Sequence, residues 1–141
     1  MQRLASQSGA GALETLTTLR DWALKLGAIS NTVQPARYMH QAHIRRGLAP
    51  FFDVEVYSSE VGVAKPHPQI FRAALDALGV APECAAYVGD WLRADVAGAQ
   101  AVGMKGILIE VAHRAEHDPA IKPDARIAEL PELLGVLSGL M

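Results

Sequence analysis

The chain has 141 residues, of which half are hydrophobic and a fifth are charged, and its formal net charge is -2. This length and composition are typical of one soluble globular domain with a sizeable core. The sequence has no basic stripe of the kind that would indicate a nucleic-acid partner. It also has no apolar run of the roughly 20 residues that are needed to cross a bilayer. Cys84 is the only cysteine, which excludes an internal disulfide and favours a reducing, cytoplasmic location.

The first half of the chain predicts two helices and two strands after a polar start. Residues 1–10 predict a flexible lead-in, and the core domain is expected over 11–141. Apolar residues at helical spacing predict a helix from Leu13 to Leu26, which Gly27 would end. A buried strand is expected at 28–31, a helix at 36–46 and a strand at 53–57.

The second half repeats the alternation. Prolines and a glycine predict a loop over 61–68, before a helix at 69–78. Strands are expected at 85–88, 106–110 and 127–128, and helices at 95–102 and 131–137. Alternating strands and helices predict an α/β fold, with a mainly parallel sheet covered on both faces. In such sheets ligands bind beyond the carboxyl ends of the strands.

Three polar clusters follow the predicted strands. Asp90 and Asp95 lie on one strand-to-helix turn, where two carboxylates can hold Mg²⁺ through oxygen ligands; helix capping is the alternative. Lys65 precedes a helix and can offset the charge of a phosphoryl group, or it can be a solvated loop lysine. Ser30 and Asn31 follow the first strand, where a hydroxyl can donate to a phosphoryl oxygen; a turn before a capped helix is the alternative.

Taken in chain order, these clusters resemble the haloacid dehalogenase-like hydrolase superfamily. The similar stretches run from Lys25 to Asn31, from Phe52 through Gly62 to Phe71, and from Tyr87 to Asp90, followed by Asp95, Gly98-Ala99 and Gly103-Met104. The resemblance covers about Leu13 to Glu110. It implies a Rossmann-like three-layer sandwich and Mg²⁺-dependent hydrolysis of a small phosphorylated metabolite through an aspartyl-phosphate.

The resemblance also implies a role for each matching residue. Ser30 and Asn31 would bind the substrate, and Lys65 would pair with the nucleophile and the phosphate. Asp90 would ligate Mg²⁺, and Asp95 would support that metal site. An acidic residue at position 90 favours phosphate over a haloacid, because the members that cleave carbon–halogen bonds tend not to keep a metal ligand there.

One part of the family pattern is missing from this sequence. The nucleophile motif, Asp-x-Asp-x-Thr, should precede Ser30, yet the only acidic residues there are Glu14 and Asp21, both in the first predicted helix. The central nucleophile strand and the cap that follows it are therefore expected to be absent, and Mg²⁺ binding is expected to be weak. The flanking strands would then pair directly, or another chain would supply a strand, or the sequence is a fragment.

Two hypotheses follow for the function. The first is a phosphatase-type hydrolase core whose activity is impaired in this chain. The second is a non-catalytic binding or assembly module, completed as a homodimer that shares a strand.

Three other histidine and cysteine groups are given no functional role. The pattern His113-x-x-Glu116-His117 resembles a zinc motif but lacks a helical frame. His40 and His43 are expected on a solvated helix edge, and Cys84 has no histidine base placed beside it.

Overall fold

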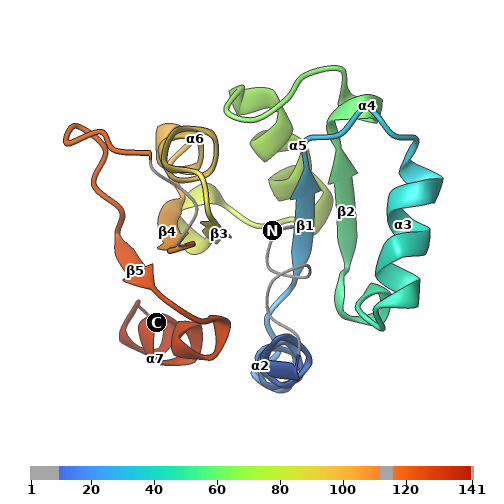
Figure 1. Cartoon of the computed structure of the whole chain (residues 1–141), viewed down its shortest axis with the longest axis horizontal. Helices are drawn as coiled ribbons and strands as arrows, with labels where there is room; N and C mark the ends of the chain where they lie inside the picture. The colour runs from blue at the N-terminus through green and yellow to red at the C-terminus, as the bar shows by residue number, and fades with distance from the viewer. Residues whose placement is uncertain (1–9, 112–115, 141) are drawn as a thin grey trace.

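The predicted alternation of helices and strands is present in the computed structural model, which describes residues 10–111 and 116–140 (Figure 1). The helices are α2 (Ala10–Asp21), α3 (Ala36–Arg45), α4 (Ser58–Val61), α5 (Pro68–Leu78), α6 (Gly98–Ala101) and α7 (Leu133–Leu140). The strands are β1 (Gly27–Ser30), β2 (Val54–Tyr57), β3 (Ala86–Gly89), β4 (Lys105–Ile109) and β5 (Ala125–Ile127). Short 3-10 turns cover Ala49–Phe51, Pro82–Cys84 and Leu130–Glu132, and a π-helix covers Leu92–Ala97.

The strands form two parallel sheets. In the first sheet β1 pairs with β2, and Ile29 lies opposite Val56. In the second sheet β4 lies between β3 and β5, with Val88 opposite Ile107. All five strands are three to five residues long, so their carboxyl ends place polar residues close to the sheet edge.

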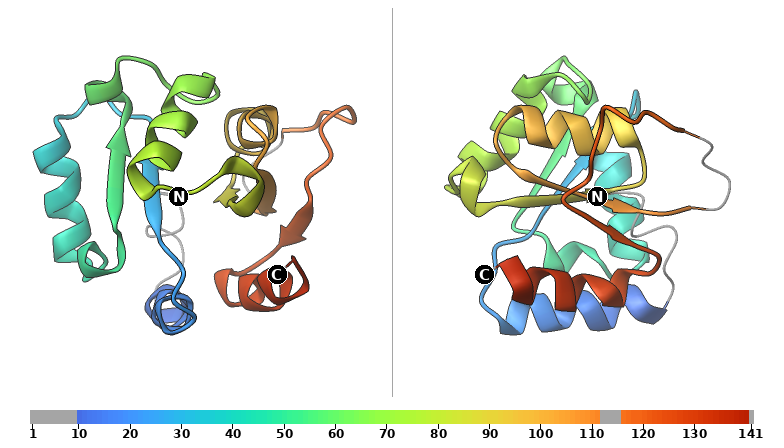
Figure 2. Two further views of the ribbon diagram at one scale, coloured as in Figure 1. Left: turned by 180° about the vertical axis from the view of Figure 1, so that it is seen from behind. Right: turned by 90° about the vertical axis from the view of Figure 1, so that its left-hand side faces the viewer.

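Helices cover both faces of the sheets, which confirms the three-layer α/β class. On one face α5 and α6 pack on Ile29, Val56 and Tyr87. On the other face α2 and α7 lie side by side (Figure 2, right) and enclose Val88, Ile107 and Ile127. Successive strand residues point to opposite faces, which explains why Tyr87 and Val88 belong to different core clusters.

The structure corrects the first predicted helix. It ends at Asp21 rather than near Leu26, and Gly27 begins β1 instead of ending the helix. The chain leaves the helix through Ala23, whose φ of 63° lies in the left-handed region, and the Leu24 N–H donates to the Leu19 carbonyl at 3.2 Å. Periodicity could not show this, because Leu24 and Leu26 continue the apolar spacing although they pack against the core from a loop.

Two further boundaries differ from the prediction. The expected loop over 61–68 is preceded by the one-turn helix α4. The helix expected from Asp95 begins at Leu92 as a π-helix, in which the N–H groups of Asp95 and Val96 both donate to the Trp91 carbonyl. Asp95 therefore lies inside this helix and is not its N-cap.

The two sheets do not join. Among the described strands, β1 pairs only with β2, and β3 pairs only with β4. Direct pairing of β1 with β3, one of the three expected outcomes, does not occur in the structure. Figure 1 shows β1 and β3 on facing sides of the interval between the sheets. The position of the expected central strand therefore has no strand of the described residues in it.

The prediction of a solvated edge for both histidines of α3 is wrong for His43, which is 2% exposed. His43 Nδ1 contacts Glu55, which also contacts His40 Nδ1 at 2.5 Å and accepts from the Tyr57 hydroxyl at 2.5 Å. Glu55 lies on β2, so the partner of these histidines comes from a different element. Partial burial would raise the pKa of Glu55, but hydrogen bonds from Tyr57, His43 and His40 outweigh it and hold the pKa below its ordinary value.

None of the helices in the described part of the chain is both long and apolar enough to cross a bilayer.

Candidate active site

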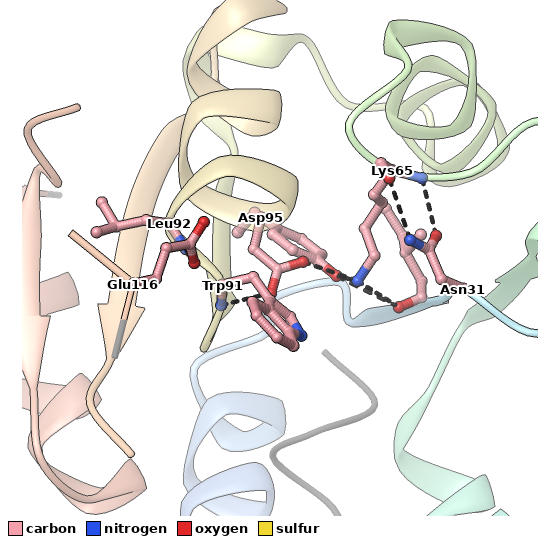
Figure 3. A network of polar contacts seen from close by, with 8 residues as sticks. Asn31, Lys65, Trp91, Leu92, Asp95 and Glu116 are labelled. Carbon is pink, nitrogen blue, oxygen red and sulfur yellow. Dashed lines mark hydrogen bonds and ion pairs between the residues drawn. The ribbon is translucent and has the colours of Figure 1, made fainter. Parts of the chain in front are cut away.

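Three of the predicted site residues, Asn31, Lys65 and Asp95, lie together beyond the carboxyl ends of β1 and β3 (Figure 3). Ser30 is the last residue of β1 and is fully buried, and its Oγ makes no hydrogen bond to the described residues. A buried hydroxyl without a partner costs free energy. Ser30 is therefore suited to donate to an oxygen of a bound ligand.

Lys65 lies in the loop before α5, and its ammonium group is buried beside Asp95. Lys65 Nζ lies 2.8 Å from Asp95 Oδ1, and the two side chains are 3% and 1% exposed. Water cannot screen a pair this deeply buried, so each charge requires the other. The prediction of a solvated loop lysine is excluded, and the ammonium group is held at the sheet edge.

Two more groups hold the Lys65 ammonium. It donates to the Tyr87 hydroxyl at 2.9 Å and to the Ile29 carbonyl at 3.4 Å. Burial, with the nearby Asp95 and Asp90 carboxylates, raises the pKa of Tyr87 well above its ordinary value. The phenol therefore stays neutral and donates to the Ile29 carbonyl at 3.3 Å. Sequence reasoning missed Tyr87, because a tyrosine within a buried strand has the pattern of a core residue.

Asn31 is engaged by the main chain of Lys65. Its Nδ2 donates to the Lys65 carbonyl at 3.1 Å, and its Oδ1 accepts from the Lys65 N–H at 2.8 Å (Figure 3). Both ends of the amide are thus used to hold the lysine loop against the end of β1. The observed role of Asn31 is to position Lys65, and its contact with substrate stays a prediction.

Asp90 follows β3 directly and is 2% exposed. It lines a recess of about 160 Å³ beyond β4, together with Glu110, Glu116, His117 and Arg126. Asp95 uses Oδ1 for Lys65 and accepts the Trp91 N–H at Oδ2, 3.1 Å away. Asp95 thus holds Lys65 and the turn after Asp90, and the metal-binding role of both aspartates stays a prediction.

These residues fit Mg²⁺ in part. Among the described residues no three histidines, cysteines or acids lie together as a metal cluster. Mg²⁺ is usually held by one or two carboxylates, and waters and substrate phosphate oxygens fill its other positions. Asp90 supplies one buried carboxylate of the kind that such a site uses.

Glu116 contributes to the structure around the site, a role that the sequence did not indicate. Its Oε1 and Oε2 accept from the N–H groups of Leu92 at 2.7 Å and Arg93 at 3.1 Å (Figure 3). The carboxylate therefore satisfies the open donors at the start of the π-helix that carries Asp95. Of the zinc-like pattern, His113 lies outside the described residues, and Glu116 has this capping role instead.

His67 caps the N-terminus of α5. Its Nδ1 accepts from the Gln69 N–H at 3.1 Å, and Pro68 occupies the first helical position. The helix that follows Lys65 therefore begins at a defined residue, which fixes the lysine loop at its carboxyl side. The peptide between Lys65 and Pro66 is cis.

Comparison with known proteins gives consistent similarities. Residues 5–103 match the family model of the haloacid dehalogenase-like hydrolases. The chain is 39% identical, over 84% of its length, to a phosphoserine phosphatase of Thermus thermophilus, of which it covers 46%. The chain thus spans about half the length of the curated relatives it matches.

Two solved structures share the fold closely. A haloacid dehalogenase-type phosphatase from Thermococcus onnurineus superposes with a TM-score of 0.81 and 34% identity, covering 98% of this chain and 62% of its own. A 2-haloacid dehalogenase from Pseudomonas syringae also superposes with a TM-score of 0.81, at 32% identity, covering 96% of this chain and 55% of its own. The fold is therefore common to proteins named for two different reactions.

Proposed function

This chain belongs to the haloacid dehalogenase-like hydrolases, and on that basis we propose that it is the phosphate-binding core of a magnesium-dependent phosphate monoester hydrolase. The observation that carries the proposal is that Ser30, Lys65 and Asp90 are all buried, with Ser30 at the carboxyl end of β1 and Asp90 directly after β3. The hydroxyl of Ser30 donates to a phosphoryl oxygen, and the ammonium group of Lys65 offsets its negative charge. Asp95 keeps that ammonium group in place.

Asp90 is the residue that would hold Mg²⁺. When bound, the ion supplies electrostatic compensation between the phosphate and an attacking carboxylate. Asp90 is also the reason to favour a phosphate over a haloacid, because the related proteins that cleave carbon–halogen bonds tend not to keep an acidic metal ligand at this position. The phosphoserine phosphatase among the relatives supports a small phosphorylated metabolite as substrate.

The nucleophile distinguishes two versions of this function. The family reaction requires an aspartate from a strand that this sequence does not show, so we expect turnover by the isolated chain to be impaired and its Mg²⁺ affinity to be low. The missing motif and the divided sheet favour, as a second function, a non-catalytic binding or assembly module, for which a homodimer is the simplest form. A cytoplasmic location stays a prediction.

Binding of inorganic phosphate tests the proposal without requiring turnover. Titration followed by ³¹P NMR in the presence of Mg²⁺ should show saturable binding to the purified chain. Ser30→Ala should weaken it at least tenfold, because a hydrogen bond to a charged group contributes about 1.5–3 kcal/mol. Ser59→Ala, which alters an exposed serine bonded to the Gln34 carbonyl, is the matched control and should bind phosphate as the parent chain does.

Hydrolysis of an aryl phosphate then separates the two versions. We expect no turnover above that of an Asp90→Asn variant, since the nucleophile motif is missing. Turnover that Asp90→Asn abolishes would show that the chain has a complete site and would overturn the expected impairment. Absence of phosphate binding by the parent chain would overturn the hydrolase proposal itself.

A further inference from the structure

Two carboxylates hold the main chain of the turn that begins at Asp90. The first is Asp95, which accepts from the N–H of the residue after Asp90. The second is Glu116, whose Oε1 and Oε2 accept from the N–H groups of Leu92 at 2.7 Å and Arg93 at 3.1 Å (Figure 3). Three consecutive main-chain donors after Asp90 are thus bonded to acids, so the course of the chain as it leaves Asp90 is fixed by two side chains.

Glu116 belongs to a segment that is itself anchored along the following helices. Residues 116–124 lead into β5, and near their end Asp124 Oδ2 accepts from Gln100 Nε2 of α6 at 3.1 Å. Between the two ends, Ile121 packs on the buried side chains of the π-helix. The segment is therefore attached at its start, middle and end, and this attachment keeps the Glu116 carboxylate at the first turn of the π-helix.

The position of the Asp90 main chain matters for any cation that Asp90 would hold. Asp90 is 2% exposed and lines the same recess of about 160 Å³ as Glu116. Mg²⁺ requires nearly ideal octahedral geometry, so a small displacement of a ligating carboxylate lowers its affinity. Groups that orient the ligands of a metal ion typically change its affinity about 10- to 100-fold when they are replaced.

From these contacts we infer that Glu116 is a positioning residue, which holds the main chain after Asp90 and thereby sets the affinity of this site for a divalent cation. The inference rests on the part of the proposed function in which Asp90 would hold Mg²⁺. Both oxygens of Glu116 are engaged by main-chain N–H groups, so this residue acts through Asp90 and not as a further ligand.

A second glutamate of the chain makes the same kind of contact elsewhere and provides a matched control. Glu132 Oε2 accepts from the N–H groups of Ala128 and Glu129 in the turn after β5. Because β4 lies between β5 and β3, loss of this contact weakens a local turn without displacing Asp90. Glu132→Gln therefore measures the purely structural effect of losing such a carboxylate.

Titration of the full chain with Mg²⁺, followed in ¹H–¹⁵N NMR spectra, tests the inference without requiring turnover. In the parent chain we expect saturable shifts of the amide signals of Asp90 and Trp91. Glu116→Gln loses the charge and one acceptor, and should weaken Mg²⁺ binding about tenfold or more. Glu132→Gln should change the affinity by less than about twofold, because salt screens an exposed charge at that distance.

Glu116→Asp separates the position of the carboxylate from its charge. The variant keeps the negative charge, but its shorter side chain cannot reach both N–H groups, so it should weaken Mg²⁺ binding as Glu116→Gln does. Parent-like affinity in Glu116→Asp would overturn the positioning role, since charge alone would then be sufficient. Equal losses in Glu116→Gln and Glu132→Gln would also overturn it, because reduced stability would explain both.

The outcomes for Glu116 and for the hydrolase proposal are distinguishable. Absence of Mg²⁺-dependent shifts near Asp90 in the parent chain would overturn the role of Glu116, whereas the hydrolase proposal is decided by phosphate binding in the ³¹P titration. A chain that binds phosphate, but whose Mg²⁺ affinity does not depend on Glu116, keeps the hydrolase proposal and loses this inference.

Discussion

The carboxylate of Asp95 lies so close to Gly89 that a Cβ atom at position 89 would overlap it. Gly89 is the last residue of β3, and Asp95 is held on the other side by Lys65. The absence of a side chain at Gly89 is therefore what lets the acid reach the lysine from the following helix.

Gly89→Ala should consequently destabilise the chain by about 1–3 kcal/mol, as expected when an atom is added to a filled interior. Urea unfolding followed by circular dichroism measures the loss. Gly135→Ala makes the same change in α7, where a Cβ would meet nothing within 4 Å, and should instead stabilise by about 0.5–1 kcal/mol. Equal effects of the two substitutions would show that Asp95 does not approach Gly89 as described.

A double-mutant cycle should detect the buried ion pair. Lys65→Met or Asp95→Asn alone leaves one buried charge without its partner, which costs about 3–5 kcal/mol in such pairs. The double variant should be more stable than the sum of the two losses predicts, since no charge is then left alone. Urea unfolding of all four proteins gives the coupling.

The exposed pair Arg126–Glu110 is the control for this cycle. Its atoms are 3.5 Å apart, and the side chains are 54% and 56% exposed. Water screens such a pair, so the cycle of Arg126→Met and Glu110→Gln should give a coupling below about 1 kcal/mol. A coupling at Lys65 and Asp95 as small as this would contradict their burial.

The Glu55 cluster should make stability depend on pH below neutrality. The pKa of Glu55 is lowered from 4.5 in the folded chain. Its charged form therefore contributes stability above the unfolded pKa, and this contribution is lost as the pH falls through the folded pKa. Unfolding by urea at pH values from 7 down to 3 should show the loss below about 4.5.

Glu55→Gln isolates the part due to this residue, because Asp53 and Asp124 also have lowered pKa values and titrate in the same range. The variant should be less stable than the parent at pH 7, and the difference should shrink as the pH falls towards 3. A difference that is constant across this range would mean that Glu55 acts through packing and not through its charge.

Replacing the cap of α5 should change stability in both directions. His67→Ala removes the acceptor for the Gln69 N–H and should cost about 1 kcal/mol, whereas His67→Asp keeps an acceptor, adds negative charge at the helix start and should be neutral or stabilising. Thermal unfolding compares the three proteins. If the His67→Ala variant were more stable than the His67→Asp variant, a capping role for position 67 would be excluded.

Much of the candidate site could be predicted from the sequence, because its signals are local. Strands of four or five apolar residues followed by a polar turn place Ser30 and Asp90 at carboxyl ends, and Pro66 with Pro68 places Lys65 in a loop before a helix. These patterns depend on neighbours within a few residues. They correctly indicated where the polar groups would lie, though not which atoms would meet.

The tertiary structure decided the partners. Asp95 was paired with Lys65, Asn31 with the Lys65 main chain, and Glu116 with the start of the π-helix, and each of these contacts joins residues from separate elements. The burial of His43 likewise depends on Glu55 of the neighbouring strand. Spacing along one element reveals which face a residue occupies, but the group that approaches that face is set by how the elements pack.

The same reason applies to the divided sheet. The sequence by itself determined that no Asp-x-Asp pattern precedes Ser30, because such a pattern can be read from the residues alone. Only the tertiary structure decided that β1 and β3 stay apart. Helices that pack across both sheets, such as α5 against Ile29 and Tyr87, hold the two edges at a separation that no local pattern encodes.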